Sequence, residues 1–247
     1  MSTRLLLLGG TSEIALAIAR RLAREEPVRP FLVGRDSRRM ESALAELERA
    51  GCDEGATDVL EADDVERHEQ VIASAFERFG GFEVVVLAVG VLGAQSGLDA
   101  DRDELLEVMR VNFVDCGSLL VQSLRRLRDQ GSGTLVVLSS VAAERGRASN
   151  PIYGGAKAGL DAMAQGLGDA AAPDGVRTLV VRPGFVHTRM TQGLKPAPFA
   201  TTADAVADAT VKALGTRAHT VWVPPALRFV FSAIRHVPRP AYRKLPL

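Results

Sequence analysis

The sequence predicts a single α/β domain, a doubly wound parallel sheet with helices on both faces, followed by a basic C-terminal extension. Short, continuous apolar runs alternate with longer amphipathic stretches, which is typical of a parallel sheet covered on both sides. The length of 247 residues suits one large domain. Apolar residues make up 47% and charged residues 24%, which excludes a disordered chain. Regular strand–helix alternation favours a Rossmann-type sheet.

Six apolar runs predict strands, and a weaker strand is expected at 55–60. The runs are Leu5–Leu8, Phe31–Val33, Val84–Ala88, Leu135–Leu138, Leu179–Val181 and Val221–Val223. Helices are expected at 13–25, 37–50, 64–79, 102–129, 152–171 and 203–215. Capping residues stand at their ends: Ser12, the Asp63-Asp64 pair, Gly131 and Gly133. The domain is therefore expected to span 1–223, with 224–247 as a proline-broken amphipathic tail that is not an independent domain.

Charge is distributed unevenly along the chain. Residues 1–175 carry 19 Lys and Arg against 28 Asp and Glu, whereas residues 176–247 carry 11 against 2. The formal net charge of zero excludes nucleic-acid binding by bulk electrostatics. The C-terminal part, in contrast, is suited to an anionic partner.

The cysteines and the N-terminal segment carry no signal for export or metal binding. Cys52 and Cys116 stand far apart, without zinc-site spacing, and are expected to be buried thiols. Met1 leads within a few residues into the first strand without a cleavage site. The longest apolar run without charge, Val84 to Ala94, has 11 residues, too few to span a bilayer. We expect a cytoplasmic protein, either free or peripheral on the inner face of the plasma membrane.

A nucleotide site is predicted where the first strand meets the first helix. Glycine lets backbone N–H groups turn tightly around a pyrophosphate, and the helix N-terminus adds partial positive charge. The predicted cofactor-binding residues of this turn are Gly9, Thr11, Ser12, Glu13 and Ile14. Glu13 and Ala15 stand where the usual G-x-G-x-x-G has glycines. A purely structural turn with a helix cap is therefore the alternative.

The end of the second strand bears on cofactor choice. A carboxylate there binds the ribose 2′-hydroxyl, and a cation accepts a 2′-phosphate. Here the strand ends at Arg35, which could stack on adenine or meet the phosphate of NADPH. The alternative is a solvated cation at the start of a helix.

Catalytic residues are predicted further along the sequence. Ser140 follows a buried strand, at the edge where α/β sheets bind ligands. Tyr153 and Lys157 are four residues apart, so their side chains share one helix face. A nearby ammonium favours the tyrosinate form and so lowers the pKa of the tyrosine hydroxyl. A tyrosine with a lowered pKa can act as a general acid at neutral pH. Ser140 could then hold a substrate carbonyl, and Asn112 could anchor a water that leads to Lys157.

Together these motifs resemble the short-chain dehydrogenase/reductase family over about residues 4–223. The resemblance rests on the glycine-rich turn, Asn112, Ser140, Tyr153, Lys157 and Pro183-Gly184-Phe185-Val186-His187-Thr188. It implies an NAD(P)H-dependent enzyme in which Tyr153 and Lys157 also contact the cofactor. The segment that begins at Pro183 and Gly184 would surround the nicotinamide. The backbone of Val186 would bind its carboxamide, and Thr188 would contribute its hydroxyl. A homo-oligomer is expected.

Two positions depart from the family pattern. Leu87-Ala88-Val89-Gly90 replaces the family's Asn-Asn-Ala-Gly, so Ala88 and Gly90 can approach the adenosine but the bracing asparagine is absent. Glu61 stands where the family has an adenine-contacting aspartate.

A narrower resemblance covers most of the chain and extends into the tail. Its segments are 6–14, Glu144-Arg145-x-Arg147, 182–190, 235–239 and 243–246. They are similar to reductases that act on a 2-keto sugar carried by a polyprenyl phosphate. That group implies NADH, a flavin-dependent partner oxidase and a role in cell-wall arabinan synthesis.

The tail is suited to a lipid substrate on physical grounds. Residues 226–247 contain no acid. They carry Arg228, Arg235, Arg239, Arg243 and Lys244 beside Phe229, Val230, Phe231, Ile234 and Val237. Such a segment can lie in a membrane interface. A lid over the substrate cleft or a subunit contact remains the alternative.

These observations predict a ketoreductase. A short-chain reductase acting on another ketone or alcohol is the alternative, and a non-catalytic nucleotide sensor is the alternative from another class.

Overall fold

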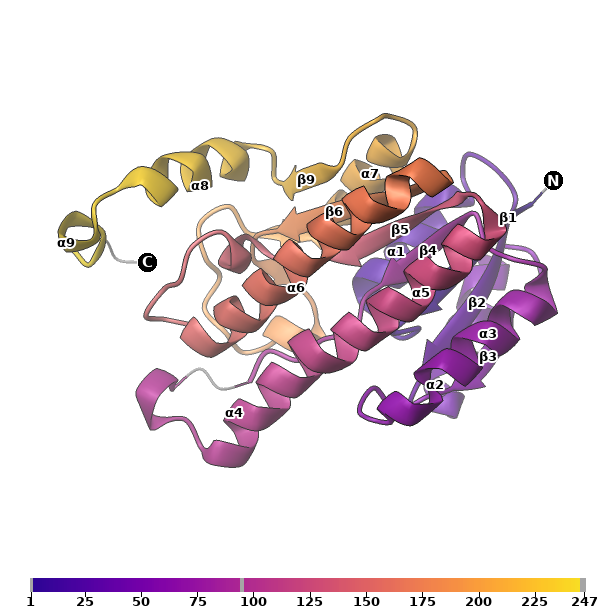
Figure 1. The fold of residues 1–247 in the computed structure, drawn as a ribbon, viewed down its shortest axis with the longest axis horizontal. Coiled ribbons are helices and arrows are strands. Elements are labelled where there is room, and N and C mark those ends of the chain that lie inside the picture. The colour runs from indigo at the N-terminus through magenta and orange to yellow at the C-terminus, as the bar shows by residue number, and fades with distance from the viewer. Residues whose placement is uncertain (1, 94–95, 245–247) are drawn as a thin grey trace.

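A parallel sheet of seven strands forms the centre of the computed structural model, which describes residues 2–93 and 96–244 (Figure 1). The strands are β1 (Thr3–Leu8), β2 (Val28–Gly34), β3 (Ala56–Val59), β4 (Val84–Leu87), β5 (Gly133–Leu138), β6 (Val176–Pro183) and β9 (Thr220–Val223). They are arranged in the order β3-β2-β1-β4-β5-β6-β9. Because the order reverses between β1 and β4, a crevice for ligands forms at the carboxyl ends of these two strands. The predicted doubly wound fold is confirmed.

Three helices cover each face of the sheet (Figure 1). One layer holds α1 (Glu13–Leu22), α2 (Ser37–Arg49) and α7 (Ala203–Leu214), and the other α3 (His68–Phe79), α5 (Cys116–Gln130) and α6 (Pro151–Ala171). In β1, Leu5 and Leu7 face the first layer and Leu6 and Leu8 the second, each at most 1% exposed. Burial on both faces explains why the strands appear as uninterrupted apolar runs.

Ser12 and Gly131 cap helices as predicted, whereas Gly133 is the first residue of β5. Ser12 accepts a hydrogen bond from the N–H of Ala15, and Gly131 ends α5 with a left-handed φ of 77°. The predicted start of the third helix at residue 64 is corrected. A 3₁₀ turn, η1 (Val65–Arg67), precedes α3, and the Asp64 side chain makes no capping bond.

The helix predicted over 102–129 is not continuous. It divides into α4 (Arg102–Met109), a π-helical turn η3 (Arg110–Asp115) and α5. Within the turn, the side-chain amide of Asn112 donates to the carbonyl of Val108 at 3.0 Å and to that of Val91 at 2.8 Å. The wider turn thereby directs Asn112 toward the segment after β4. Hydrophobic periodicity does not reveal such an insertion.

The cysteines lie in the core as predicted. Cys52 and Cys116 are buried and unpaired, and burial raises the pKa of each thiol to about 11.

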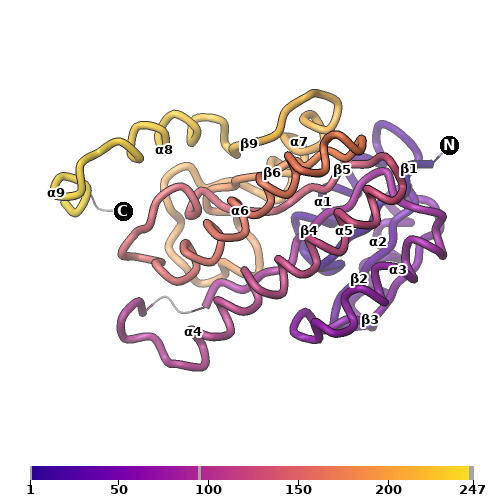
Figure 2. Tube along the Cα trace, viewed as in Figure 1, coloured from indigo at the N-terminus to yellow at the C-terminus, as the bar shows by residue number. Residues whose placement is uncertain are grey.

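The tail is helical (Figure 2). After β9 come α8 (Ala226–His236) and α9 (Arg239–Tyr242), while residues 245–247 lie outside the described part. Leu227 and Phe231 are buried in a small cluster with Val141 and Trp222. The first helix of the tail is therefore packed against the turn that follows β5. Within the described residues, no helix is both long and apolar enough to cross a bilayer.

Shorter elements complete the connections. They are η2 (Gly97–Asp99), η4 (Val141–Ala143), η5 (Ala172–Asp174), β7 (Val186–His187), η6 (Arg189–Thr191) and β8 (Thr201–Thr202). The strands β7 and β8, which the sequence did not predict, pair with each other outside the main sheet.

Candidate active site

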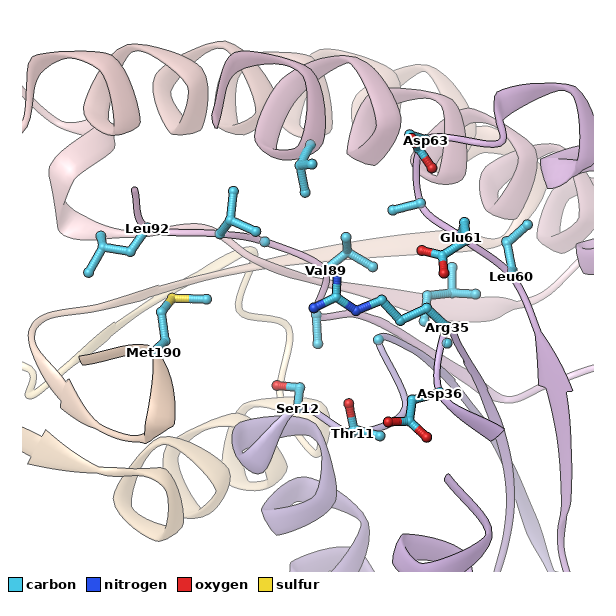
Figure 3. A pocket seen from close by; sticks show the side chains of 18 of the residues that line it. Thr11, Ser12, Arg35, Asp36, Leu60, Glu61, Asp63, Val89, Leu92 and Met190 are labelled. Atoms are coloured by element: carbon cyan, nitrogen blue, oxygen red, sulfur yellow. The ribbon is translucent and has the colours of Figure 1, made fainter. Parts of the chain in front are cut away.

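A cleft of about 1070 Å³ opens at the carboxyl edge of the sheet (Figure 3). Most of the predicted cofactor-binding residues line it: Gly9, Thr11, Ser12, Glu13, Ile14, Arg35, Glu61, Ala88, Gly90 and Thr188. The predicted catalytic residues Asn112 and Ser140 are not part of its wall. The same holds for the other predicted cofactor-binding residues: Tyr153, Lys157, Pro183, Gly184 and Val186. The cleft thus corresponds to the predicted adenosine and pyrophosphate side of the site.

The glycine-rich turn is shaped by close backbone packing. Gly9 has a φ of +91°, and a Cβ on it would lie 2.9 Å from the carbonyl carbon and oxygen of Ala88. The N–H groups of Gly9 and Gly10 both donate to the carbonyl of Val33, at 2.9 and 2.8 Å. Only glycine allows this approach of β1 to β4. The turn leaves the N-terminus of α1 at the cleft, which fits a pyrophosphate-bearing cofactor.

Arg189 joins the turn to the segment after β7. Its backbone N–H donates to the Glu13 carboxylate at 2.7 Å, and its guanidinium donates to the carbonyl of Thr11 at 2.6 Å. Sequence reasoning assigned no role to Arg189, although it follows the predicted cofactor residue Thr188. The pairing also offsets the negative charge that Glu13 brings to a site for phosphates.

At the adenosine end, Arg35 extends from β2 into the cleft toward Val89, with Glu61 on the adjoining wall (Figure 3). Asp36, the next residue, accepts from the backbone N–H of Arg39 at 3.0 Å and caps α2. Asp36 is therefore occupied as a helix cap, and the exposed Arg35 side chain reaches the cleft.

The predicted catalytic residues converge from α6, β5 and η3. Lys157 is 4% exposed, and its ammonium donates to the carbonyl of Leu138 at 3.1 Å, two residues before Ser140. Ser140 accepts a hydrogen bond from the N–H of Ala142 at 3.1 Å. Tyr153 is half-buried one helical turn before Lys157. The fold therefore sets the tyrosine–lysine pair beside the end of β5.

Asn112 lies next to Lys157 across Gly90. A Cβ on Gly90 would be 2.9 Å from Asn112 Oδ1 and 3.4 Å from Lys157 Nζ. Asn112 Oδ1 accepts from the N–H of Val91 at 3.3 Å, so the side chain holds the segment after β4 in place. The predicted water relay stays a prediction, but its two protein ends are adjacent.

A buried ion cluster supports this arrangement. Asp161, one turn after Lys157, accepts from Ser139 Oγ at 2.5 Å and from two nitrogens of Arg182 at 2.9 and 2.6 Å. Arg182 also pairs with Glu144, whose side chain is 4% exposed. Burial works to lower the pKa of Arg182, but the two carboxylates outweigh it and raise that pKa.

The cluster fixes the flanks of the site, and sequence reasoning missed it. Ser139 precedes Ser140, and Arg182 precedes Pro183 and Gly184. Two features of the sequence could have indicated the cluster. Asp161 follows Lys157 by four residues, so both lie on one face of the helix, and Arg182 directly precedes the Pro183-Gly184 pair.

Comparison with known proteins defines the class. The family model for short chain dehydrogenases matches residues 3–198. An uncharacterized oxidoreductase of Mycobacterium tuberculosis is 40% identical over 240 residues, covering 97% of this chain and 96% of its own length.

Solved structures share the fold. An actinorhodin polyketide ketoreductase, solved with NADPH, has a TM-score of 0.80 at 24% identity and covers 92% of this chain and 97% of its own. A short chain dehydrogenase of Burkholderia cenocepacia, solved with NADP, has a TM-score of 0.84 at 16% identity, with coverage of 100% and 98%.

The fold and the cleft thus define a nucleotide-dependent oxidoreductase. The chain belongs to the short-chain dehydrogenase/reductase family and is an NAD(P)-dependent enzyme.

Proposed function

We propose that this protein reduces a ketone at the edge formed by β4, β5 and α6. The observation that carries the proposal is the placement of Lys157: it shares a helix face with Tyr153, and its ammonium is anchored to the Leu138 carbonyl beside Ser140. Held in the cleft by the turn at Gly9, Thr11 and Ser12, NAD(P)H would supply the hydride for the carbonyl carbon. Ser140 holds the carbonyl oxygen, and Tyr153 donates a proton to it. Lys157 stabilises the resulting tyrosinate, and Asn112 supports the path by which Tyr153 regains its proton.

Replacement of Tyr153 by Phe tests this assignment. The variant loses the proton donor but little shape, so turnover is expected to fall by about 100-fold or more, the usual scale of general acid catalysis. Cofactor binding, measured by quenching of Trp222 fluorescence, should persist. Wild-type turnover in Tyr153→Phe would rule out its role as the acid.

For the substrate, we propose decaprenylphosphoryl-2-keto-erythro-pentose, reduced to decaprenylphosphoryl-arabinose for cell-wall arabinan. The support is the narrower sequence resemblance, which includes the tail, together with the basic and apolar character of 226–247. A flavin-dependent oxidase would supply the keto sugar as partner, and the enzyme would act on the inner face of the plasma membrane. A short-chain reductase for another ketone or alcohol, such as an acyl, terpenoid or steroid-like compound, is the alternative.

A substrate panel separates these two proposals. The keto-sugar lipid, a β-ketoacyl thioester and a cyclic terpenoid ketone are offered with NADH and then with NADPH, and oxidation of the cofactor is followed. Turnover of the lipid alone supports the first proposal, whereas preference for either other ketone supports the alternative.

For the cofactor, we propose a preference for NADPH. The support is Arg35, a cation that directly follows β2 and reaches into the cleft, whereas the adjacent Asp36 accepts from the backbone N–H of Arg39 as the cap of α2. The two structural neighbours described above were solved with NADPH and NADP. The narrower resemblance implies NADH instead, and the panel above measures both.

A further inference from the structure

The loop between η4 and α6 carries three charged side chains, and two of them are fully engaged. Glu144 pairs with Arg182 and Arg235 and accepts from the indole N–H of Trp222 at 3.0 Å. Arg145 donates to the carbonyls of Ile234 and Arg235 at the end of α8. Both therefore hold the tail against this loop.

Arg145 also contacts α9. Its guanidinium carbon lies 4.0 Å from the ring centroid of Tyr242, whose hydroxyl donates to the carbonyl of Gly146 at 3.1 Å. The two contacts place Tyr242 against the same loop, so both α8 and α9 pack on it.

Arg147 is the third charged residue of the loop, and it lacks such partners. Its Nε is buried without a hydrogen bond, and over residues 2–93 and 96–244 no ion pair involves its guanidinium. The Phe231 ring centroid lies 5.8 Å from its guanidinium carbon. A half-buried cation is costly unless an anion or strong acceptors compensate it.

Arg147 is also placed near the reacting end of the site. Burial lowers its pKa, and the phenol groups of Tyr242 and Tyr153 are close enough to oppose that shift. The loop that carries Arg147 runs from η4, where the N–H of Ala142 donates to Ser140, to the first turn of α6, which holds Tyr153.

We propose that Arg147 binds an anionic group of the ketone substrate. The planar guanidinium can accept a phosphate or carboxylate in a two-point fork, which would supply the missing partner. Phe231 and Tyr242 would cover the apolar part next to that group. The inference rests on the proposed ketoreductase function and deepens it: the substrate is an anionic ketone, whether a lipid phosphodiester, a free sugar phosphate or a keto acid.

Matched substrates test the charge requirement. Ribulose 5-phosphate is compared with ribulose, and 4-oxocyclohexanecarboxylate with its methyl ester. In Arg147→Gln, kcat/KM for the charged member of a pair should fall at least 10-fold more than for its neutral counterpart, mainly through KM, the scale of a charged hydrogen bond. Arg147→Lys should recover part of the loss, and the exposed Arg24→Gln serves as the control with unchanged values.

The two pairs and the keto-sugar lipid distinguish the source of the anion. Selective loss with ribulose 5-phosphate and the lipid indicates a phosphate site, and loss with the carboxylate alone indicates a keto-acid site. Equal losses for charged and neutral substrates, or no loss, would overturn the inference.

A binding measurement keeps the test independent of turnover. Calorimetric titration of ribulose 5-phosphate into the protein saturated with NADP⁺ should give at least 10-fold weaker binding for Arg147→Gln than for wild type. If wild type binds the phosphate through Arg147 but reduces no ketone, the proposed function fails and the anion site stands. If wild type and a folded Arg147→Gln variant, checked by its melting curve, bind the phosphate equally or not at all, the anion site is wrong.

Discussion

At the scale of single residues, the site depends on how each charge is compensated. Lys157 is almost fully buried, yet its ammonium has the Leu138 carbonyl as an acceptor and lies against Gly90. Arg189 is compensated by Glu13, and Asp36 by the backbone of α2. Among the residues that the structure describes, Arg35 and Arg147 differ, because no ion pair involves either guanidinium. Arg35 lines the cleft, and Arg147 lies beside Phe231 of the tail. Cations left in this state are the ones expected to meet ligands.

Arg35 carries the first prediction at this scale. In Arg35→Ala, NADPH binding should weaken by about 1.5–3 kcal/mol, the scale of a hydrogen bond to a charged group, while NADH binding changes little. The dissociation constants of both cofactors, measured by fluorescence titration, check this. Equal weakening for NADH and NADPH would show that Arg35 does not contact the 2′-phosphate.

The sequence predicted residues with a local signature and missed those defined by tertiary contact. Tyr153 and Lys157 follow from a four-residue spacing, and the turn at Gly9 follows from glycine after a strand. Asp161 and Arg182 come from different elements, and nothing in local periodicity brings them together. The sequence also did not predict the π-helical turn around Asn112, whose side chain is hydrogen-bonded to Val91 on another segment.

At the scale of elements, the buried ion cluster joins α6, β5, β6 and α8. Asp161 and Arg182 have side chains only 5% and 10% exposed, so the pair is shielded from water. The ion pair of Arg21 with Asp208, which links α1 to α7, has an Asp208 side chain that is 65% exposed. The two pairs offer a direct comparison of buried and exposed links between elements.

Removal of one carboxylate from each pair gives the second prediction. Asp161→Ala leaves a buried guanidinium without its two-point partner and should lower the free energy of unfolding by about 3–5 kcal/mol. Asp208→Ala should lower it by less than about 1 kcal/mol, because solvent screens the exposed pair. Urea unfolding of both variants measures the difference. Similar losses would mean that the cluster contributes no more than a surface pair.

His68, at the start of α3, carries a pH prediction. It is buried, and its ring nitrogens are matched to the Ser118 hydroxyl and the Ala62 carbonyl at 2.9 Å each. Burial lowers its pKa, against the opposing effects of Ala62 and Asp64. The unfolded chain therefore takes up a proton that the folded state resists, so the free energy of unfolding falls as pH drops below about 6.5.

The measurement is the urea midpoint at pH 7.5 and at pH 5.5. Wild type should lose stability between these values, and His68→Gln should lose less, because the titrating group is gone. The exposed His219→Gln is the matched control and should keep the wild-type slope. If His68→Gln shows the full wild-type loss, burial of this ring is not the source of the pH dependence.

At the scale of the whole molecule, the charge is separated along the chain. The part from residue 176 onward carries 11 Lys and Arg against 2 acids, in a protein with formal net charge zero. In the tail, Arg235 forms an ion pair with Glu144, whereas Arg239, Arg243 and Lys244 are exposed. Phe229 is 73% exposed on the same tail. Cations beside exposed apolar surface are suited to an anionic membrane surface.

Truncation after His236 separates this membrane contact from the fold. The shortened protein keeps α8, with Leu227 and Phe231 buried, so it should melt close to wild type. It loses three exposed cations, worth about 1 kcal/mol each near anionic headgroups, so its affinity for vesicles should fall roughly a hundredfold.

The vesicle assay decides between the two interpretations of the tail. Full-length protein should co-sediment with phosphatidylglycerol-containing vesicles at low salt, remain in solution with neutral vesicles, and be released near 1 M salt, where the Debye length is about 3 Å. A packed lid or a subunit contact would instead make the truncated protein melt earlier or change its oligomer size. If the full-length protein ignores anionic vesicles and the truncation melts much earlier, the last eleven residues serve the fold, and the substrate must reach Tyr153 without help from a membrane-bound tail.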